Sequence, residues 1–188
     1  MRMFVAARPP DAAVEHLAGY LEPRQQAGGP LRWTSIEQWH LTLAFLPAVA
    51  DADLDELVER LSGAIARQPG LSLGLAGAGA FPHPAAAKTL WAGVSGDTDA
   101  LSRVADAARS ASVRAGVEVD GGRFRPHLTL ARIGRPVDVT RWLRVLELYT
   151  GPSWQAGELA LFESHLGGGP GGRARHELRE TFGLASPP

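Results

Sequence analysis

The sequence contains no cysteine. This absence excludes disulfide bonds, thiolate zinc sites and cysteine nucleophiles, so any chemistry must come from histidine, hydroxyl, carboxyl or guanidinium groups. Lysine is almost absent too, because Lys88 is the single lysine among 19 basic residues and the other 18 are arginines. Guanidinium groups bind phosphate oxygens in a bidentate manner, so the arginines nearest a candidate site are of interest for anion binding.

Long apolar runs and a large excess of charge are also missing. No run approaches the roughly 18 residues of a transmembrane helix, and the opening MRMFVAARPP lacks the apolar segment of a signal peptide. We therefore expect a cytoplasmic protein. The net charge of −1 disfavours non-specific binding to long nucleic acid or to membranes. A chain of 188 residues with 45% hydrophobic content predicts one domain over residues 1–188, and we expect a monomer.

Strand and helix patterns alternate along the chain, and the second half repeats the order of the first. Period-two segments predict strands over 3–7, 31–34, 39–46, 71–77, 89–94, 126–133, 156–163 and 175–182. Apolar residues at helical spacing predict helices over 10–21, 54–65 and 139–146, and a further helix that begins near Leu101 and ends at Gly116. The strands are too closely spaced for a doubly wound parallel sheet, so we expect an α+β fold made of two similar lobes. The glycine-rich segment 166–172 lacks the ending of a phosphate-binding loop and is expected to be a hairpin loop.

One strand sequence occurs twice, as HLTLAF at 40–45 and HLTLAR at 127–132. The two copies share five of six residues, and their histidines are 127 − 40 = 87 positions apart. Successive side chains of a strand point to opposite faces, so each copy places two leucines on one face and a histidine beside a threonine on the other. Packing alone would require only the leucines to recur. The recurrence of the polar residues therefore favours a functional interpretation over a merely structural histidine.

Other sites that use histidine fit the motif less well. The sequence has HxT in place of HxH, has no HExxH, and offers no carboxylate at a neighbouring position on the same face, so a metal site would gather only two evident ligands. We therefore expect no metal and no cofactor. A Ser-His-Asp triad is disfavoured because no GxSxG elbow is present.

Paired histidines with paired hydroxyls suit phosphodiester cleavage without a metal. Histidine has an ordinary pKa near 6.5, so one imidazole can accept a proton from water while the other donates one to a leaving oxygen. Threonine hydroxyls and arginines can hold the non-bridging phosphate oxygens. A strained cyclic phosphate is the most suitable target, because its leaving oxygen stays tethered.

With these two motifs the chain resembles the 2H phosphoesterase superfamily, and within it the RNA 2′,3′-cyclic phosphodiesterases once called 2′-5′ RNA ligases. The resemblance extends over nearly the full length, through MRMFVAARPP, WTSIEQWHLTLAFL, GAFPHPAAAKTLWAGV, GGRFRPHLTLARI and LALFESHLGGGPGGRARHELRETF. It implies a bilobal fold in which antiparallel sheets line a central cleft with helices outside. It also implies hydrolysis of a 2′,3′-cyclic phosphate, at an RNA end or on a nucleoside, to a 2′-phosphomonoester.

The resemblance also assigns roles to the motif residues. His40 would be the proton donor to the 3′ oxygen, and His127 the proton acceptor that activates water. Thr42 and Thr129 would bind phosphate. Arg132 matches a further phosphate-binding position, although strict alternation places it on the leucine face, so a twist or bulge must bring it round.

Further residues near the motifs are candidates for nucleoside contacts. Phe81 and His83 could touch a nucleoside, and Phe124 beside Arg125 could stack on a base. The four histidines outside the two motifs, His83 included, are expected at the surface; these are His16, His83, His165 and His176.

Two alternative functions remain open. An RNA ligase would form a 2′,5′ linkage by the same chemistry in reverse, with a sugar hydroxyl in place of water. A non-catalytic protein would bind nucleotides or RNA ends without turnover. The expected partners are RNA with a cyclic phosphate end or small cyclic nucleotides, and no membrane.

Overall fold

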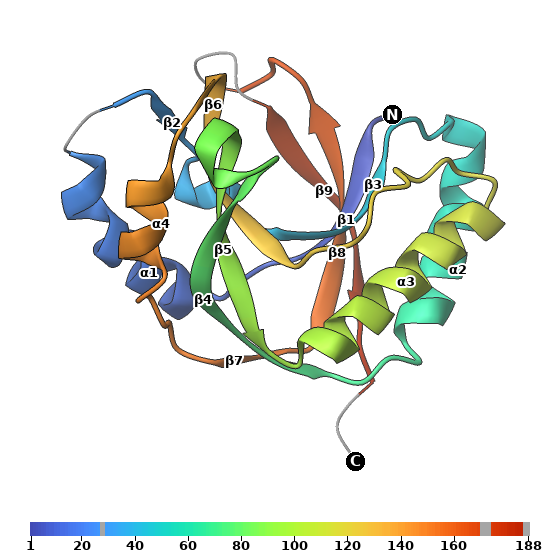
Figure 1. The fold of residues 1–188 in the computed structure, drawn as a ribbon. Helices are drawn as coiled ribbons and strands as arrows, with labels where there is room; N and C mark the ends of the chain where they lie inside the picture. The colour runs from blue at the N-terminus through green and yellow to red at the C-terminus, as the bar shows by residue number, and fades with distance from the viewer. Residues whose placement is uncertain (27–28, 170–173, 186–188) are drawn as a thin grey trace.

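The computed structural model describes residues 1–26, 29–169 and 174–185 (Figure 1). These residues form the expected α+β fold, with nine strands in one antiparallel sheet and four α-helices. The strands are β1 (Met3–Ala7), β2 (Leu31–Trp33), β3 (Leu41–Leu46), β4 (Leu71–Phe81), β5 (Ala87–Gly96), β6 (His127–Val137), β7 (Trp154–Ala156), β8 (Glu158–His165) and β9 (Arg175–Gly183). The helices are α1 (Asp11–Gln25), α2 (Leu54–Ile65), α3 (Thr98–Arg114) and α4 (Thr140–Leu146).

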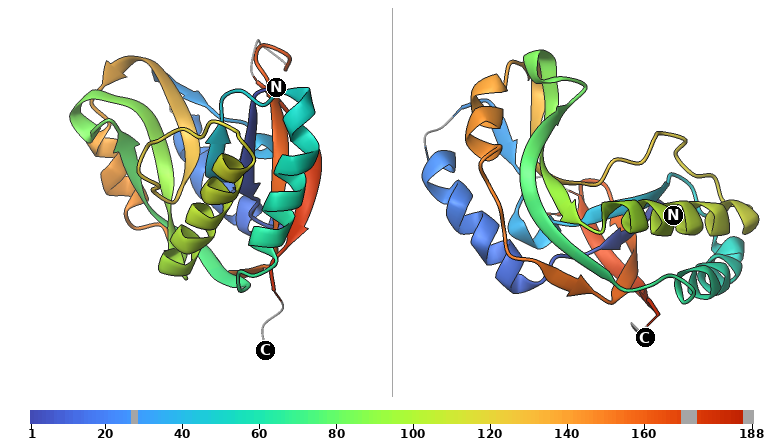
Figure 2. Two further views of the ribbon diagram at one scale, coloured as in Figure 1. Left: turned by 90° about the vertical axis from the view of Figure 1, so that its right-hand side faces the viewer. Right: turned by 60° about the horizontal axis from the view of Figure 1, so that its bottom comes forward.

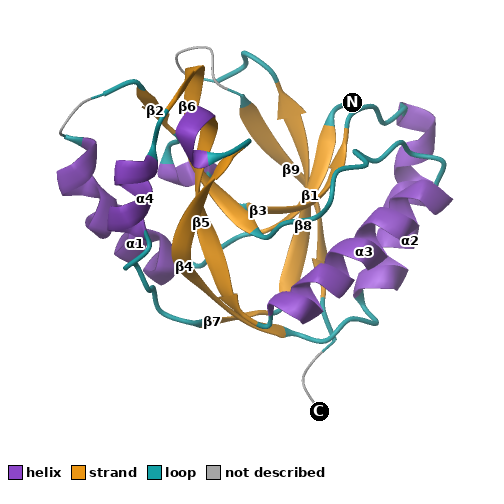
Figure 3. Cartoon of the chain, in the orientation of Figure 1, coloured by secondary structure: helices purple, strands orange, loops and turns teal. Residues whose placement is uncertain are grey.

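The predicted elements all occur, with some differences in their bounds. The short edge strand β7 (Figure 3) was not predicted, because three residues are too few to show a period. Strands β4 and β5 run several residues beyond the predicted segments, and helix α3 begins at Thr98, ahead of the predicted Leu101. Of the expected hairpin loop 166–172, residues 170–172 lie outside the described residues.

The sheet consists of two groups of strands that join at the repeated motif. The strand order is β7-β4-β5-β6-β3-β1-β8-β9, with β2 paired to β6. At the junction, β3 pairs with β6 through a single residue pair, Leu41 with Leu128. The two groups are not the two halves of the chain, as the repeated order of elements had suggested, because β8 and β9 return to the group of β1 and β3. The sheet curls between the helices (Figure 2).

Helices cover the leucine face of the motif strands. Helices α1 and α4 lie on one side of the molecule and α2 and α3 on the other (Figure 1). Their apolar side chains and the motif leucines belong to one buried core, in which the leucines are at most 1% exposed; these are Leu41, Leu43, Leu128 and Leu130. Burial of leucine side chains contributes about 1.5 to 3 kcal/mol each. The core thus fixes which face of β3 and β6 points away from the helices.

No helix among the described residues is long and apolar enough to cross a membrane.

Candidate active site

The two copies of the repeated motif meet in the middle of the sheet. Antiparallel pairing of Leu41 with Leu128 sets the strands β3 and β6 side by side in opposite directions. The opposite face of the two strands carries the four polar motif residues, His40, Thr42, His127 and Thr129, all half-buried. The antiparallel register places each histidine next to the threonine of the other motif. We call this side of the sheet the motif face.

Each motif histidine is anchored by the backbone carbonyl two residues before it. Nδ1 of His40 lies 2.6 Å from the carbonyl oxygen of Gln38, and Nδ1 of His127 lies 2.7 Å from that of Arg125. A carbonyl can only accept, so Nδ1 carries the hydrogen and donates it. The Nε2 atom of each ring is thereby left for proton transfer in the same tautomer on both histidines.

Burial lowers the pKa of both histidines. For His40, burial lowers the pKa from 6.5 to about 4, against the opposing effect of the Gln38 carbonyl. Burial also lowers the pKa of His127, and the positive charge of Arg132 lowers it further. Both imidazoles are therefore neutral at pH 7 in the free protein. A bound anion would raise both pKa values, because a nearby negative charge favours the imidazolium.

A β-bulge brings Arg132 onto the motif face, as the sequence required. Along β5 the partners are regular, with Thr89 opposite Arg132 and Trp91 opposite Thr129, while β6 contains one extra residue between them. Thr89 and Trp91 share a face of β5, so Arg132 shares the face of Thr129. The Arg132 guanidinium also lowers the pKa of His40, which places its charge close to both motifs.

The first motif contains a bulge at the corresponding place. The pairing of β1 with β3 shifts its register so that Leu43 is the extra residue. Phe45 thereby occupies the position that Arg132 occupies in the second motif. The guanidinium carbon of Arg2 lies 4.5 Å from the centre of the Phe45 ring. The two motifs are therefore alike in backbone and different in charge.

Aromatic rings surround His127. Its ring centre lies 5.0 Å from that of Phe81, edge to face, and 5.8 Å from that of Trp91. The indole of Trp91 lies over Gly79, where a Cβ atom would come within 2.1 Å of the ring. The Nε1 atom of Trp91 is buried and has no hydrogen-bond partner among the described residues. Sequence patterns did not identify Trp91, because its approach to His127 depends on pairing across strands.

His40 is packed against Phe4 and a third histidine. Its ring stacks on Phe4 at 4.6 Å between centres and meets His176 edge to face at 5.2 Å. The expectation that His176 lies at the surface was wrong: it is half-buried on β9, and burial with the charges of Arg132 and Arg2 lowers its pKa. No local pattern could show this, because β9 reaches His40 only through β8 and β1.

The expected nucleoside contacts are found in two different settings. Phe81 lies on the motif face beside His127, with the Arg125 guanidinium carbon 5.8 Å from its ring centre. Phe124 packs partly against the main core, and His83 is exposed. The structure thus brings Phe81 and Arg125 close to the motif histidines.

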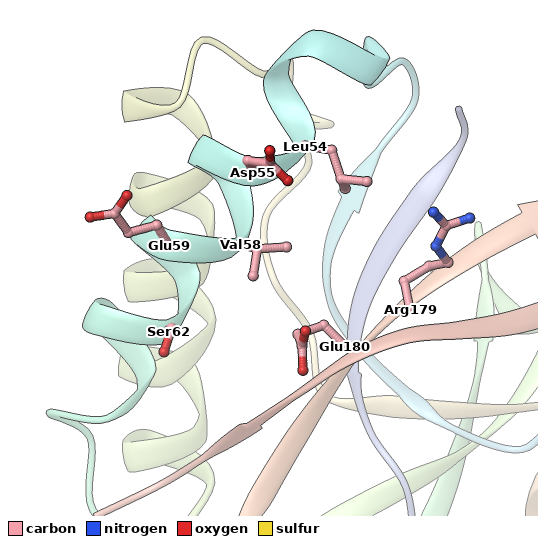
Figure 4. A pocket seen from close by; sticks show the side chains of 7 residues that line it. All are labelled: Leu54, Asp55, Val58, Glu59, Ser62, Arg179 and Glu180. Atoms are coloured by element: carbon pink, nitrogen blue, oxygen red, sulfur yellow. The ribbon is translucent and has the colours of Figure 1, made fainter.

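One hollow lies away from the two motifs. It has a volume of about 470 Å³ between α2 and β9 (Figure 4) and is lined by Leu54, Asp55, Val58, Glu59, Ser62, Arg179 and Glu180. Its Arg179 is paired with Glu163 at 2.8 Å, so three carboxylates dominate its charge. Such a lining repels a phosphodiester.

The groups on the motif face can transfer protons and bind an anion. In the described parts of the chain, no three histidine or carboxylate side chains gather as ligands for a metal ion. Two imidazoles with free Nε2 atoms can act as an acid and a base. The two threonine hydroxyls and the Arg132 guanidinium can donate hydrogen bonds to phosphate oxygens.

Comparison with known families gives a match over most of the chain. The family model described as the 2′-5′ RNA ligase superfamily matches residues 8–168. Several curated relatives bear the name RNA 2′,3′-cyclic phosphodiesterase, among them the proteins of Aeropyrum pernix and Archaeoglobus fulgidus. The protein of Aeropyrum pernix is 33% identical over 120 residues, which are 64% of this chain and 67% of that protein. The protein of Archaeoglobus fulgidus is 32% identical over 135 residues, which are 72% and 74% of the two chains.

Solved structures share the whole fold. E. coli LigT complexed with 3′-AMP superposes with a TM-score of 0.77 at 26% identity, over 97% of each chain. TT0787 of Thermus thermophilus superposes with a TM-score of 0.76 at 23% identity, over 99% of each chain. The curled sheet with its outer helices is therefore an arrangement that these proteins have in common.

Proposed function

This chain belongs to the 2′-5′ RNA ligase superfamily, and from that membership and its paired histidines we propose that it hydrolyses 2′,3′-cyclic phosphate ends of RNA to 2′-phosphomonoesters. The observation that carries the proposal is the antiparallel meeting of the two motifs at Leu41 and Leu128, which sets two imidazoles and two hydroxyls on one face. The names of the relatives from A. pernix and A. fulgidus support the same reaction. The LigT complex with 3′-AMP supports binding of a nucleotide by this fold.

In the proposed reaction the two histidines move one proton each. Nε2 of His127 takes a proton from water as the water oxygen attacks phosphorus. The bond from phosphorus to the 3′ oxygen breaks, and Nε2 of His40 gives its proton to that oxygen. The 2′ ester bond stays, so one water is consumed and a 2′-phosphomonoester is released. His127 then releases its proton to solvent and His40 takes one up, which restores both histidines.

The phosphate itself prepares His40 to act as the acid. In the free protein the pKa of His40 is about 4, so its protonated form is scarce at pH 7. A bound phosphodiester monoanion raises that pKa, and the Gln38 carbonyl continues to accept from Nδ1–H of the imidazolium. Thr42, Thr129 and Arg132 hold the non-bridging oxygens and so place the anion between the rings.

The test is hydrolysis of an RNA oligonucleotide with a 2′,3′-cyclic phosphate end in excess EDTA. The expected product carries a 2′-phosphate, and replacement of His40 or His127 by alanine lowers the rate by about 10²–10⁴-fold while the circular dichroism spectrum stays unchanged. An intact ring after prolonged incubation with folded wild-type protein contradicts the proposal. Loss of folded protein in both variants would assign the histidines a structural role instead.

Ligation is the second candidate, favoured by the family name that the chain matches. Incubation with two RNA halves, one ending in a cyclic phosphate and one beginning with a 5′ hydroxyl, separates the two reactions. We expect hydrolysis to exceed ligation, because water is present at much higher concentration than the hydroxyl.

The cytoplasmic location and the monomeric state stay predictions.

A further inference from the structure

A second arginine stands beside Arg132 on the motif face. Arg32 of β2 pairs directly with Arg132 of β6, and directly opposed residues of antiparallel strands point to the same side. Arg132 is on the motif face because of the bulge in β6. Arg32 therefore extends a row that crosses four strands of the motif face, formed by Phe81, Thr89, Arg132 and Arg32.

Neither guanidinium group is paired with a carboxylate in the part of the chain that the structure describes. Among the described residues, the arginines in ion pairs are Arg60, Arg175 and Arg179. Arg32 and Arg132 are both exposed and have no ion pair within that part of the chain. Like charges directly opposite each other destabilise a sheet. A bound anion would remove that repulsion, because it would be held by two guanidinium forks at once.

The position of Arg32 suits a second anion that lies next to the reacting phosphate. β3 and β2 pair with the same edge of β6, β3 at Leu128 and β2 from Ala131 to Ile133. Arg132 lies between the motif histidines, whose pKa values its charge lowers, and Arg32. An anion held by Arg32 is thus displaced from the histidines in the direction of β2.

We propose that Arg32 binds the phosphate on the 5′ side of the terminal nucleotide, with Arg132 shared between that phosphate and the reacting one, so the substrate is an RNA end of at least two nucleotides. This inference rests on the proposed hydrolysis of cyclic phosphates. A free cyclic nucleotide has only the reacting phosphate and leaves Arg32 unused. An RNA end carries a second phosphate that joins the terminal nucleoside to its neighbour, and this is the anion that the row accommodates.

The test compares three substrates that share the same reacting ring. The first is adenosine 2′,3′-cyclic phosphate, the second is the dinucleotide ApA with a 2′,3′-cyclic phosphate end, and the third is that dinucleotide with a neutral methylphosphonate in place of its internal phosphate. For the wild-type protein, kcat/KM should be about tenfold or more higher for the charged dinucleotide than for the methylphosphonate. In Arg32→Ser that ratio should fall to about one, and the rate of hydrolysis of the cyclic mononucleotide should stay within about twofold of wild type.

A matched control and a second measurement separate binding from folding. Arg103→Ser removes the same charge from an exposed position in the middle of α3 and should leave the ratio unchanged. Arg32→Ser should unfold at the wild-type temperature or above, because it relieves the repulsion from Arg132. It should also reduce the slope of log Kd against log salt for the 2′-phosphate product of the dinucleotide by about 0.7.

Three results would overturn the inference. The first is a wild-type ratio near one between charged and neutral dinucleotides, and the second is a ratio that survives Arg32→Ser. The third is equal loss by Arg32→Ser on all three substrates together with a lower unfolding temperature, which would mean that Arg32 only supports β2. Failure of the wild-type protein to open any of the three rings would instead contradict the proposed function.

Discussion

At the scale of single residues, two histidines with the same anchor differ because of what surrounds them. Both donate from Nδ1 to a carbonyl two residues earlier, so both have the same tautomer. His40 lies between Phe4 and His176, while His127 is more open and faces the guanidinium groups of Arg125 and Arg132. The environment, and not the motif, therefore has to divide the acid role from the base role.

The division of roles predicts a selective rescue. If His40 donates the proton to the 3′ oxygen, a substrate whose 3′ leaving atom is sulfur needs no such proton, because a thiolate is a good leaving group. His40→Ala should then regain most of its lost rate on the sulfur substrate, and His127→Ala should regain little, as measured by kcat with each substrate. Rescue of His127→Ala alone would show that the two roles are exchanged.

The lowered pKa values predict an acid-shifted rate profile. Because kcat/KM reports the free enzyme, both limbs of its bell should lie below pH 6.5, whereas kcat should have its maximum at higher pH, after the phosphate has raised both pKa values. His176→Asn removes a group that lowers the pKa of His40. The limb of the kcat/KM profile that His40 sets should therefore move toward higher pH. His16→Asn, at an exposed position on α1, is the control and should leave the profile unchanged. An unchanged profile in His176→Asn would contradict this account of the contact.

At the scale of elements, the same bulge in β3 and β6 sets which side chain follows each HxT. The bulge itself was expected from Arg132, since alternation alone would have buried a charge. The contacts of Trp91, His176 and Arg32 were not predictable, because each depends on the register between strands that are distant in sequence. Sequence patterns thus identified the strands and the motif histidines, while the surroundings of those histidines required the three-dimensional pairing.

The contact between Gly79 and Trp91 predicts the effect of one added methyl group. Gly79→Ala would place Cβ within 2.1 Å of the indole, so the ring must shift and its contacts with Phe81 and His127 must change. We expect a loss of about 1 to 3 kcal/mol in the free energy of unfolding by urea, with a lower kcat. Trp91→Phe in the same chain should recover much of the stability.

A helix glycine provides the matched control for that substitution. Gly19 lies inside α1 with no atom within 4 Å of its would-be Cβ. Gly19→Ala should stabilise the protein by about 0.5 to 1 kcal/mol. If Gly79→Ala also proved neutral or stabilising, the close packing of Trp91 on β4 would be contradicted.

At the scale of the whole molecule, two groups of strands with a helix pair each meet at the motif, where β3 pairs with β6 (Figure 1). The leucines of both motifs belong to the same core, so the polar groups on the opposite face are held in place by packing. That packing places imidazoles where charge is disfavoured. The cost of forming the site should therefore appear in the stability of the fold.

The buried histidines predict that stability falls with acid. An unfolded histidine takes up a proton near pH 6.5, whereas folded His40 does so only near pH 4. The folded state thus binds fewer protons in this range. The free energy of unfolding therefore has its full value above pH 6.5 and falls as the pH drops toward 4. For His40 alone the loss at pH 4.5 is on the order of 2 kcal/mol. Urea unfolding of His40→Asn should show a pH dependence weaker by that amount, and equal dependence in both proteins would contradict the burial of His40.

The most direct measurement of the central claim is a titration with 2′-AMP followed by NMR of the histidine ring nitrogens. If the two motifs flank one phosphate, the Nε2 signals of His40 and His127 shift together with the same midpoint and saturate with one ligand bound per chain, and the pKa values of both rings rise. The signals of His16, exposed on α1, should stay unchanged. A shift of only one of the two rings, or of neither at saturation, would contradict the claim.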